Sequence, residues 1–247
     1  MDDAQHLDKA PIVEALIDFR IKPREGLTFA DLEPLRRRIQ SRYTTFTQAR
    51  VLKAEIGIKE GVFVPPNASH TLIGFRCESL DKRYVLQAHV DGFTVSRLRP
   101  YETWAVLREE AKWLWDAYVE VVKPSSVLRT AVRYINRLEI TVPCDFDEYL
   151  TCAPRIPVKL PQLYAGFVSR VVVPYEEGGI QMVITQALEP FIPETMKSPI
   201  ILDIDVFLEQ VLDVAQGGYW ETLETLRVLK NKAFFGSITD KAVELYK

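Results

Sequence analysis

Two stretches of the chain, 101–122 and 219–235, show helical spacing of apolar residues, and each follows a series of segments in which apolar and polar residues alternate. The spacing is that of a helix with one face on a core. In the first stretch the apolar positions are Trp104, Leu107, Ala111, Leu114, Tyr118 and Val121. The alternating segments predict strands with one apolar face. They are 12–21, 50–59, 72–80 and 83–98, then 128–141, 164–174, 180–188 and 199–207.

A shorter helix is expected after the first strand of each series, at 29–43 and at 145–150. Both halves of the chain are then β-α-β-β-β-α, and equivalent elements are separated by a nearly constant number of residues. We therefore predict an internal duplication, with one half at 1–124 and the other at 125–247, together forming one compact, pseudo-symmetric unit.

Strands with one apolar face need helices to cover that face. The predicted fold class is α+β, with a broad, twisted, mostly antiparallel sheet and the two long helices on one side. The other side of the sheet is expected to be open. This arrangement resembles, by analogy alone, the saddle of the TATA-binding-protein fold, and such an analogy assigns no function.

Two local features of the first half concern the connections between its strands. Asp91-Gly92 fits either a hairpin turn or a bulge within one long strand, and we favour the bulge because alternation resumes at once at Phe93. The segment 61–70 contains Pro65-Pro66-Asn67, which predicts a loop.

The charge balance narrows the classes of partner. The 247 residues carry 31 lysines and arginines against 34 aspartates and glutamates, a net charge of −3. This argues against a general nucleic-acid coat, which needs a basic excess. No run of apolar residues is long enough to span a membrane, and the N-terminus is acidic, unlike a secretory signal. We expect a cytoplasmic protein without membrane association, and reduced thiols at its three cysteines.

The common catalytic motifs are missing from the sequence. It contains no phosphate-binding GxxxxGK[ST] or GxGxxG loop, no GxSxG and no HExxH, and its three histidines are far apart. We therefore predict no cofactor and no metal site, and leave open whether the chain is an enzyme.

Charged residues gather on one side of the predicted sheet. Arg133 and Arg137 alternate with the apolar residues of strand 128–141, and Asp203 and Asp205 do so in strand 199–207. In the first half, Arg97 and Arg99 are expected to be the corresponding charged residues on this side of the sheet. The candidate ligand-binding residues are Arg97, Arg99, Arg133, Arg137, Asp203 and Asp205. They form either a salt-bridged open face or an arginine-lined groove for an anion.

Two polar positions depart from their surroundings. Asn136 lies on the apolar side of its strand, so it must be hydrogen-bonded, either in a structural bridge from the sheet to a long helix, which we favour, or at a pocket. Lys230, Asn231 and Lys232 lie within the last long helix and are interpreted as its exposed face rather than as a phosphate contact.

Five segments together carry a resemblance. They are PIVEALIDFR (11–20), FTVSRLRPYETWAVL (93–107), AVRYINRLEI (131–140), ILDIDVF (201–207) and LRVLKNKAFFGSIT (226–239). The chain resembles a sporadically distributed, uncharacterised family of prokaryotic proteins of similar length. That family has no established activity, so the resemblance transfers no catalytic residue. Its patchy distribution implies an accessory role, such as defence or toxin neutralisation.

The leading functional hypothesis is a binding module that uses the open sheet face or the cleft between the halves. Its partner would be an anionic small molecule or a protein, and a homodimer is possible. One alternative is an enzyme acting on an anionic substrate, with Asp203 or Asp205 as base and Arg133 or Arg137 as anion clamp. The other is a nucleic-acid-binding saddle.

Overall fold

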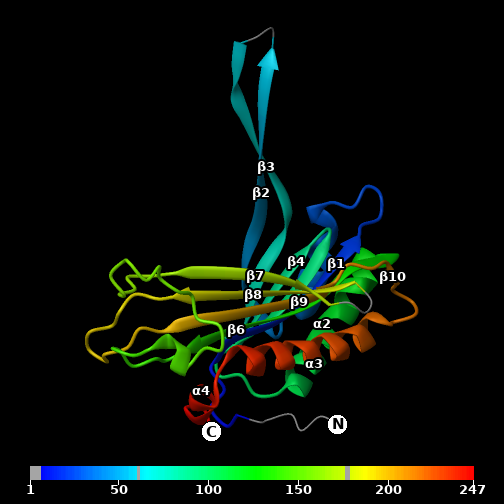
Figure 1. Cartoon of the computed structure of the whole chain (residues 1–247). Coiled ribbons are helices and arrows are strands. Elements are labelled where there is room, and N and C mark those ends of the chain that lie inside the picture. Colours follow the sequence, from blue (N-terminus) through cyan, green and yellow to red (C-terminus); the bar gives the residue numbers. More distant parts are fainter. Residues whose placement is uncertain (1–6, 60–61, 176–178) are drawn as a thin grey trace.

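One large antiparallel sheet organises the chain, and its strands follow the order β2-β3-β4-β5-β1-β6-β9-β8-β7 (Figure 1). The computed structural model describes residues 7–59, 62–175 and 179–247, without the side chains of 52–70. The strands are β1 (Ile12–Lys22), β2 (Tyr43–Lys59), β3 (Val62–Ser79), β4 (Tyr84–His89), β5 (Gly92–Leu98), β6 (Ser126–Leu138), β7 (Val168–Pro174), β8 (Ile180–Leu188), β9 (Ile200–Leu208) and the short β10 (Leu212–Asp213), which pairs with β6. The predicted α+β class with an antiparallel sheet is confirmed.

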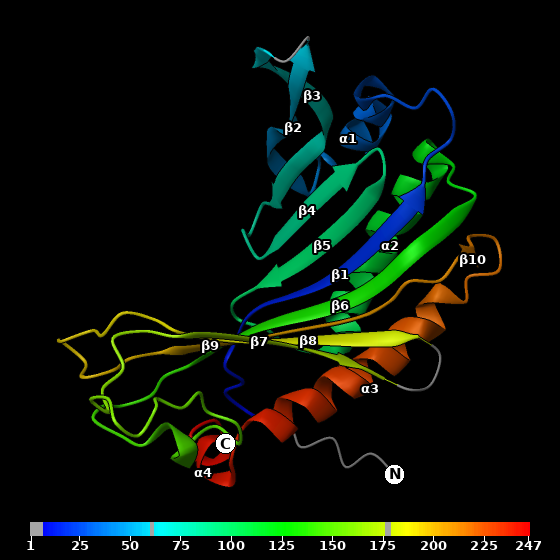
Figure 2. The same ribbon diagram turned by 45° about the horizontal axis from the view of Figure 1, so that its top comes forward.

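Two long helices lie on the same side of this sheet (Figure 2). Helix α2 (Trp104–Val122) packs on β1 and β5, and helix α3 (Tyr219–Ser237) packs on β6, β8 and β9. The side chain of Phe19 on β1 contacts both Trp115 of α2 and Tyr219 of α3. The core therefore lies between one face of the sheet and the two helices. Shorter elements are α1 (Glu33–Ile39), α4 (Asp240–Glu244) and the 3-10 turns η1 (Phe29–Leu32) and η2 (Phe146–Glu148).

The apolar stripe of α2 faces the sheet as its spacing predicts. Leu107, Ala111 and Leu114 are fully buried. Replacing Leu107 by alanine is expected to lower the free energy of unfolding by about 2–5 kcal/mol, since it removes a packed side chain and leaves a cavity. Urea denaturation of the variant and the wild type measures this difference. A change below about 0.5 kcal/mol, the range of surface sites, would contradict the packing.

The bulge expected at Asp91-Gly92 is wrong. Val90 and Asp91 form the turn of a hairpin, and Gly92 is the first residue of β5, which pairs antiparallel with β4 from His89↔Gly92 to Tyr84↔Arg97. The first half therefore has four strands after α1, not the three that were expected. A loop of two residues is the commonest connection between the strands of a hairpin.

The loop expected at 61–70 is also wrong where the structure describes it. From residue 62 onward this segment belongs to β3, which pairs with β2 to form a long hairpin that projects from the sheet (Figure 1). The neighbouring β4 pairs with β3 only between Gly74 and Glu78. Pro65 and Pro66 fall where the register between β2 and β3 shifts, which is where a strand tolerates residues that cannot donate a backbone hydrogen bond.

The helix expected at 29–43 is shorter and divided. It consists of η1 followed by α1, and Pro34 lies in the first turn of α1, where its lack of an N–H costs no hydrogen bond. Among the residues that the structure describes, no helix combines the length and apolar character that crossing a membrane requires.

Candidate functional site

The open face of the sheet holds four of the six predicted site residues, and ion pairs link them to neighbouring strands. Arg133 on β6 donates to Asp203 on β9 through two parallel hydrogen bonds, Nε to Oδ1 at 2.8 Å and Nη2 to Oδ2 at 2.5 Å. These bonds raise the pKa of Arg133 above its ordinary value. The predicted pairing of Arg133 with an aspartate of β9 is therefore present in the structure.

Asp205 and Arg137 have other partners. Asp205 accepts from Arg129 at 3.0 Å, and Arg129 also donates to Asp18 at 3.0 Å. Burial raises the pKa of Asp205. Arg137 donates to Glu189 at 2.6 Å and pairs with Glu139, not with Asp203 or Asp205 as expected. On this face each predicted arginine already has a carboxylate partner.

Arg97 does not belong to the open face. It lies opposite Ala15 of β1 in the sheet, and Ala15 is a core residue, so Arg97 points to the helix side, where it is 3% exposed. Arg99 follows the end of β5 and is exposed. The structure therefore does not bring Arg97 together with Arg133 and Arg137 on one surface. Burial raises the pKa of Tyr246, whereas the charges of Arg99 and Arg137 both act to lower it.

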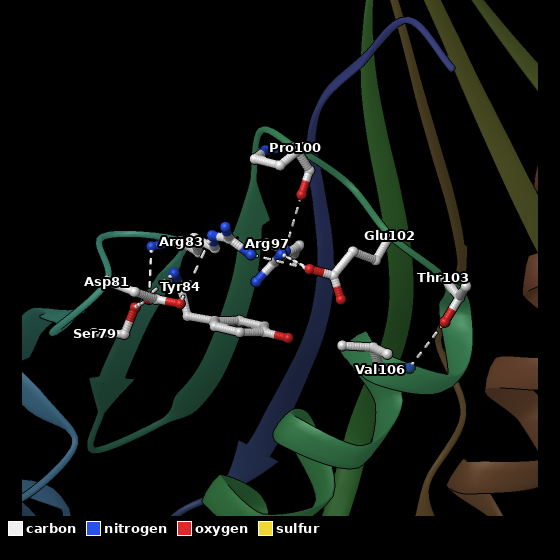
Figure 3. A network of polar contacts seen from close by, with 9 residues as sticks. All are labelled: Ser79, Asp81, Arg83, Tyr84, Arg97, Pro100, Glu102, Thr103 and Val106. Carbon is white, nitrogen blue, oxygen red and sulfur yellow. Dashed lines mark hydrogen bonds and ion pairs between the residues drawn. The ribbon is translucent and has the colours of Figure 1, made fainter. Parts of the chain in front are cut away.

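Arg97 instead fixes the connection between β5 and α2 (Figure 3). Its Nη2 donates to Glu102 at 2.6 Å and its Nε donates to the carbonyl of Pro100 at 3.2 Å. Arg83 donates to the same glutamate at 3.1 Å, and Thr103 caps α2 by accepting from the backbone N–H of Val106 at 3.3 Å. These contacts fix the connection whose residues 101–104 form one wall of a cavity.

The cavity has a volume of about 550 Å³ and lies between four parts of the chain. They are the segment before β1, the connection 101–104, β6 and α3. Apolar and aromatic side chains supply much of its lining, among them Ile12, Trp104, Phe234 and Phe235. Its polar lining includes Tyr101, Tyr134, Asn136, Arg227 and Lys230. A volume of this size suits a small organic molecule.

Two tyrosines and an asparagine contribute polar groups to this cavity, Tyr134 and Asn136 from β6 and Tyr101 from the connection before α2. The hydroxyls of Tyr101 and Tyr134 are 3.0 Å apart and hydrogen-bonded, and burial raises the pKa of both, so both keep their protons at neutral pH. Asn136 is buried as predicted, and its Nδ2 donates to the carbonyl of Leu202 at 3.0 Å. This bond joins β6 to β9 within the sheet, not the sheet to a long helix as the sequence favoured, and Asn136 also lines the cavity.

Lys230 is the most unusual group in the wall. Its side chain is buried, its Nζ lies 3.7 Å from the centre of the Tyr134 ring, and it donates to Asn231 Oδ1 at 2.5 Å. Burial first, and then the positive charge of Arg227, lower the pKa of Lys230 to about 7. The expectation that Lys230 lies on an exposed helix face is wrong, whereas Lys232 is exposed.

Two carboxylates near this cavity, Glu102 in its lining and Glu224 beside Trp104, are engaged by other groups. Glu102 is held by Arg83 and Arg97. Glu224 accepts from Trp104 Nε1 at 2.9 Å and pairs with Arg108 at 3.0 Å and with Arg227 at 3.7 Å. Within the described ranges, no carboxylate forms an ion pair with Lys230. Lys230 therefore offers a cation, or a neutral amine, to a bound molecule.

Helical spacing contains the signal that would have identified Lys230. Leu223, Leu226, Lys230 and Phe234 follow one another at intervals of three and four residues, and all four are buried. A lysine on an apolar stripe is a stronger indication of a site than a lysine in a charged run, because burial without a partner is costly.

The described part of the chain contains no group of three histidine, cysteine, aspartate or glutamate side chains arranged to hold a metal. A scan against protein-family models found no match, and a search of curated proteins found no significant similarity.

Proposed function

We propose that the chain binds a small anionic molecule in the cavity between β6 and α3. The observation that carries this proposal is the amine of Lys230, buried in the cavity wall without a carboxylate partner among the described residues. A buried cation is stabilised when an anion binds beside it. Arg227 lines the same cavity and adds a second positive charge, since its contact with Glu224 is 3.7 Å long and therefore weaker than the arginine pairs on the open face, at 2.5 and 2.6 Å.

The lining also indicates the shape of the ligand. Trp104, Phe234 and Phe235 contribute flat, apolar surface, and the hydroxyl pair of Tyr101 and Tyr134 contributes polar atoms. A flat or apolar body with one carboxylate or phosphate group fits these contacts. This is the binding module expected from the sequence, placed in the cleft where segments of both halves meet.

The open sheet face has weaker support as a binding surface. An anion there would compete with Asp203 for Arg133 and with Glu189 for Arg137. The same pairing weakens both alternatives drawn from the sequence. An aspartate held by two hydrogen bonds to Arg133 is a poor general base, and arginines neutralised by neighbouring carboxylates are poor phosphate contacts.

The first test is calorimetric titration with benzoate, a flat molecule with one carboxylate. We expect binding at pH 6, and a loss of affinity of about tenfold or more in the Lys230→Met variant, the scale of a charged hydrogen bond. The affinity of the wild type should also fall by about tenfold between pH 6 and pH 9, since an amine with a pKa of about 7 loses its charge over that range while benzoate stays ionised.

Lys232→Met is the matched control, because Lys232 is an exposed lysine on the same helix. This variant should bind benzoate as the wild type does. Equal affinities of the wild type and Lys230→Met, or an affinity of the wild type that is the same at pH 6 and pH 9, would contradict the proposed role of the cavity.

We also propose that the two halves are structural repeats with a saddle-like arrangement. The strand order supports this, because β1 and β6 each pair with the last long strand of their own series, β5 and β9, and a long helix follows each of those strands. The strands β4, β3 and β2 then extend outward on one side, and β8 and β7 on the other.

A further inference from the structure

The cavity wall contains a lysine where an arginine would serve anion binding at least as well. Arg227 already lines the cavity, and a guanidinium keeps its charge at any physiological pH. A lysine amine differs in one chemical respect, since it can lose its proton and then act as a nucleophile. The lysine at position 230, buried on α3, can therefore supply a neutral amine, which an arginine at the same position could not.

The surroundings of Lys230 favour the neutral form near pH 7. Burial and the charge of Arg227 both act against protonation, and the pKa falls to about 7. The other titratable groups of the cavity do not reverse this, since Tyr101 and Tyr134 keep their protons, and Glu102 and Glu224 pair with arginines. Asp8 also lines the cavity, but it is not among the groups that shift the pKa of Lys230, which are burial and Arg227. An exposed lysine is almost wholly protonated at the same pH.

We infer that Lys230 is a nucleophile that forms an imine with the carbonyl carbon of a small oxo acid bound in the cavity. This rests on the proposed binding function and names the class of ligand, an aldehyde or ketone that also carries a carboxylate. Arg227 holds the carboxylate, and the carbonyl group lies at Nζ beside the Tyr134 ring.

The reaction needs no oxidant or reductant. The lone pair of Nζ adds to the carbonyl carbon, the π electrons of the carbonyl move to its oxygen, and that oxygen receives a proton from the nitrogen. The resulting carbinolamine loses its hydroxyl group, which takes the second proton of the nitrogen and leaves as water. The hydroxyl pair of Tyr101 and Tyr134 belongs to the same wall and can relay these protons.

Reductive trapping of the full chain tests this inference. The protein is mixed with a low concentration of 4-formylbenzoate and with sodium cyanoborohydride, and the modified lysine is located by peptide mass mapping. We expect Lys230 to be modified at least about tenfold faster than Lys232, with a rate that is half-maximal near pH 7. Lys230→Met should lose this label and Lys232→Arg should keep it.

The outcomes separate this inference from the proposed function. If benzoate binds but 4-formylbenzoate does not label Lys230 faster than the exposed lysines, the inference is overturned and the binding function stands. If neither compound binds or labels, both are overturned. The pH profile of the wild type decides the question even if a variant fails to fold, since a label that increases only above pH 9 would come from ordinary lysines.

Discussion

Replacing Lys230 by methionine is expected to raise the free energy of unfolding at pH 6 by about 2–5 kcal/mol. The pKa of this lysine falls from 10.5 to about 7 on folding. At pH 6 both the folded and the unfolded chain carry the proton, so the folded state bears the whole cost of burying the charge, about 1.4 kcal/mol for each unit of pKa. The contact of Nζ with the Tyr134 ring offsets part of that cost.

The sign of the pH dependence follows from the same shift. Between about pH 7 and pH 10.5 the unfolded chain binds more protons at this position than the folded chain, so the stability of the wild type rises with pH over that interval. Below pH 7 and above pH 10.5 this contribution is constant. The advantage of Lys230→Met should therefore be largest at pH 6 and should shrink toward pH 10.

Urea denaturation at pH 6, 8 and 10 measures these differences, with Lys232→Met as the control for an exposed lysine. The control should stay within about 0.5 kcal/mol of the wild type. A Lys230→Met variant that is less stable than the wild type at pH 6 would show that the amine is stabilised by its surroundings. A variant that gains stability and loses benzoate binding would show that the lysine serves binding at the expense of stability.

Local patterns predicted the elements with one apolar face well. The limits of β8 agree with the predicted strand at 180–188, and the stripe around Leu107 correctly predicts α2. Asp91-Gly92 was misjudged because alternation continues on both sides of it, so the pattern fits either a bulge or a hairpin. Only the pairing of β4 with β5 distinguishes the two, and pairing between strands is not a local property.

The predicted site illustrates the same limit. The alternation of side chains along β6 and β9 correctly places Arg133 near Asp203. The same alternation along β5 assigns Arg97 to the side of Phe93 and Val95, which are core residues. The open-face hypothesis instead groups Arg97 with arginines that are exposed. The cavity could not be predicted at all, since its wall combines residues near positions 10, 102, 135 and 230, which only the folded sheet and helices bring together.

Replacing Trp115 by alanine is expected to cost about 3–5 kcal/mol of stability, the second large effect. Trp115 is 1% exposed and packs with ring centroids 4.5 Å from Phe19, 5.3 Å from Phe93 and 5.6 Å from Tyr219. Its Nε1 donates to the hydroxyl of Tyr219 at 3.0 Å. The side chain thus joins α2, the sheet and α3, and its removal leaves a cavity and takes one of two hydrogen bonds from the Tyr219 hydroxyl, which still donates to the carbonyl of Val214 at 3.4 Å.

Trp115→Phe is the matched control, because it keeps an aromatic ring in the core and removes the indole N–H. We expect it to cost about 1–2 kcal/mol, the combined scale of a lost hydrogen bond and a smaller ring. Thermal and urea unfolding of both variants give the two values. If Trp115→Ala and Trp115→Phe lose the same stability, the hydrogen bond to Tyr219 dominates. A loss below about 1 kcal/mol in both would mean that α2 and α3 do not share one core through this residue.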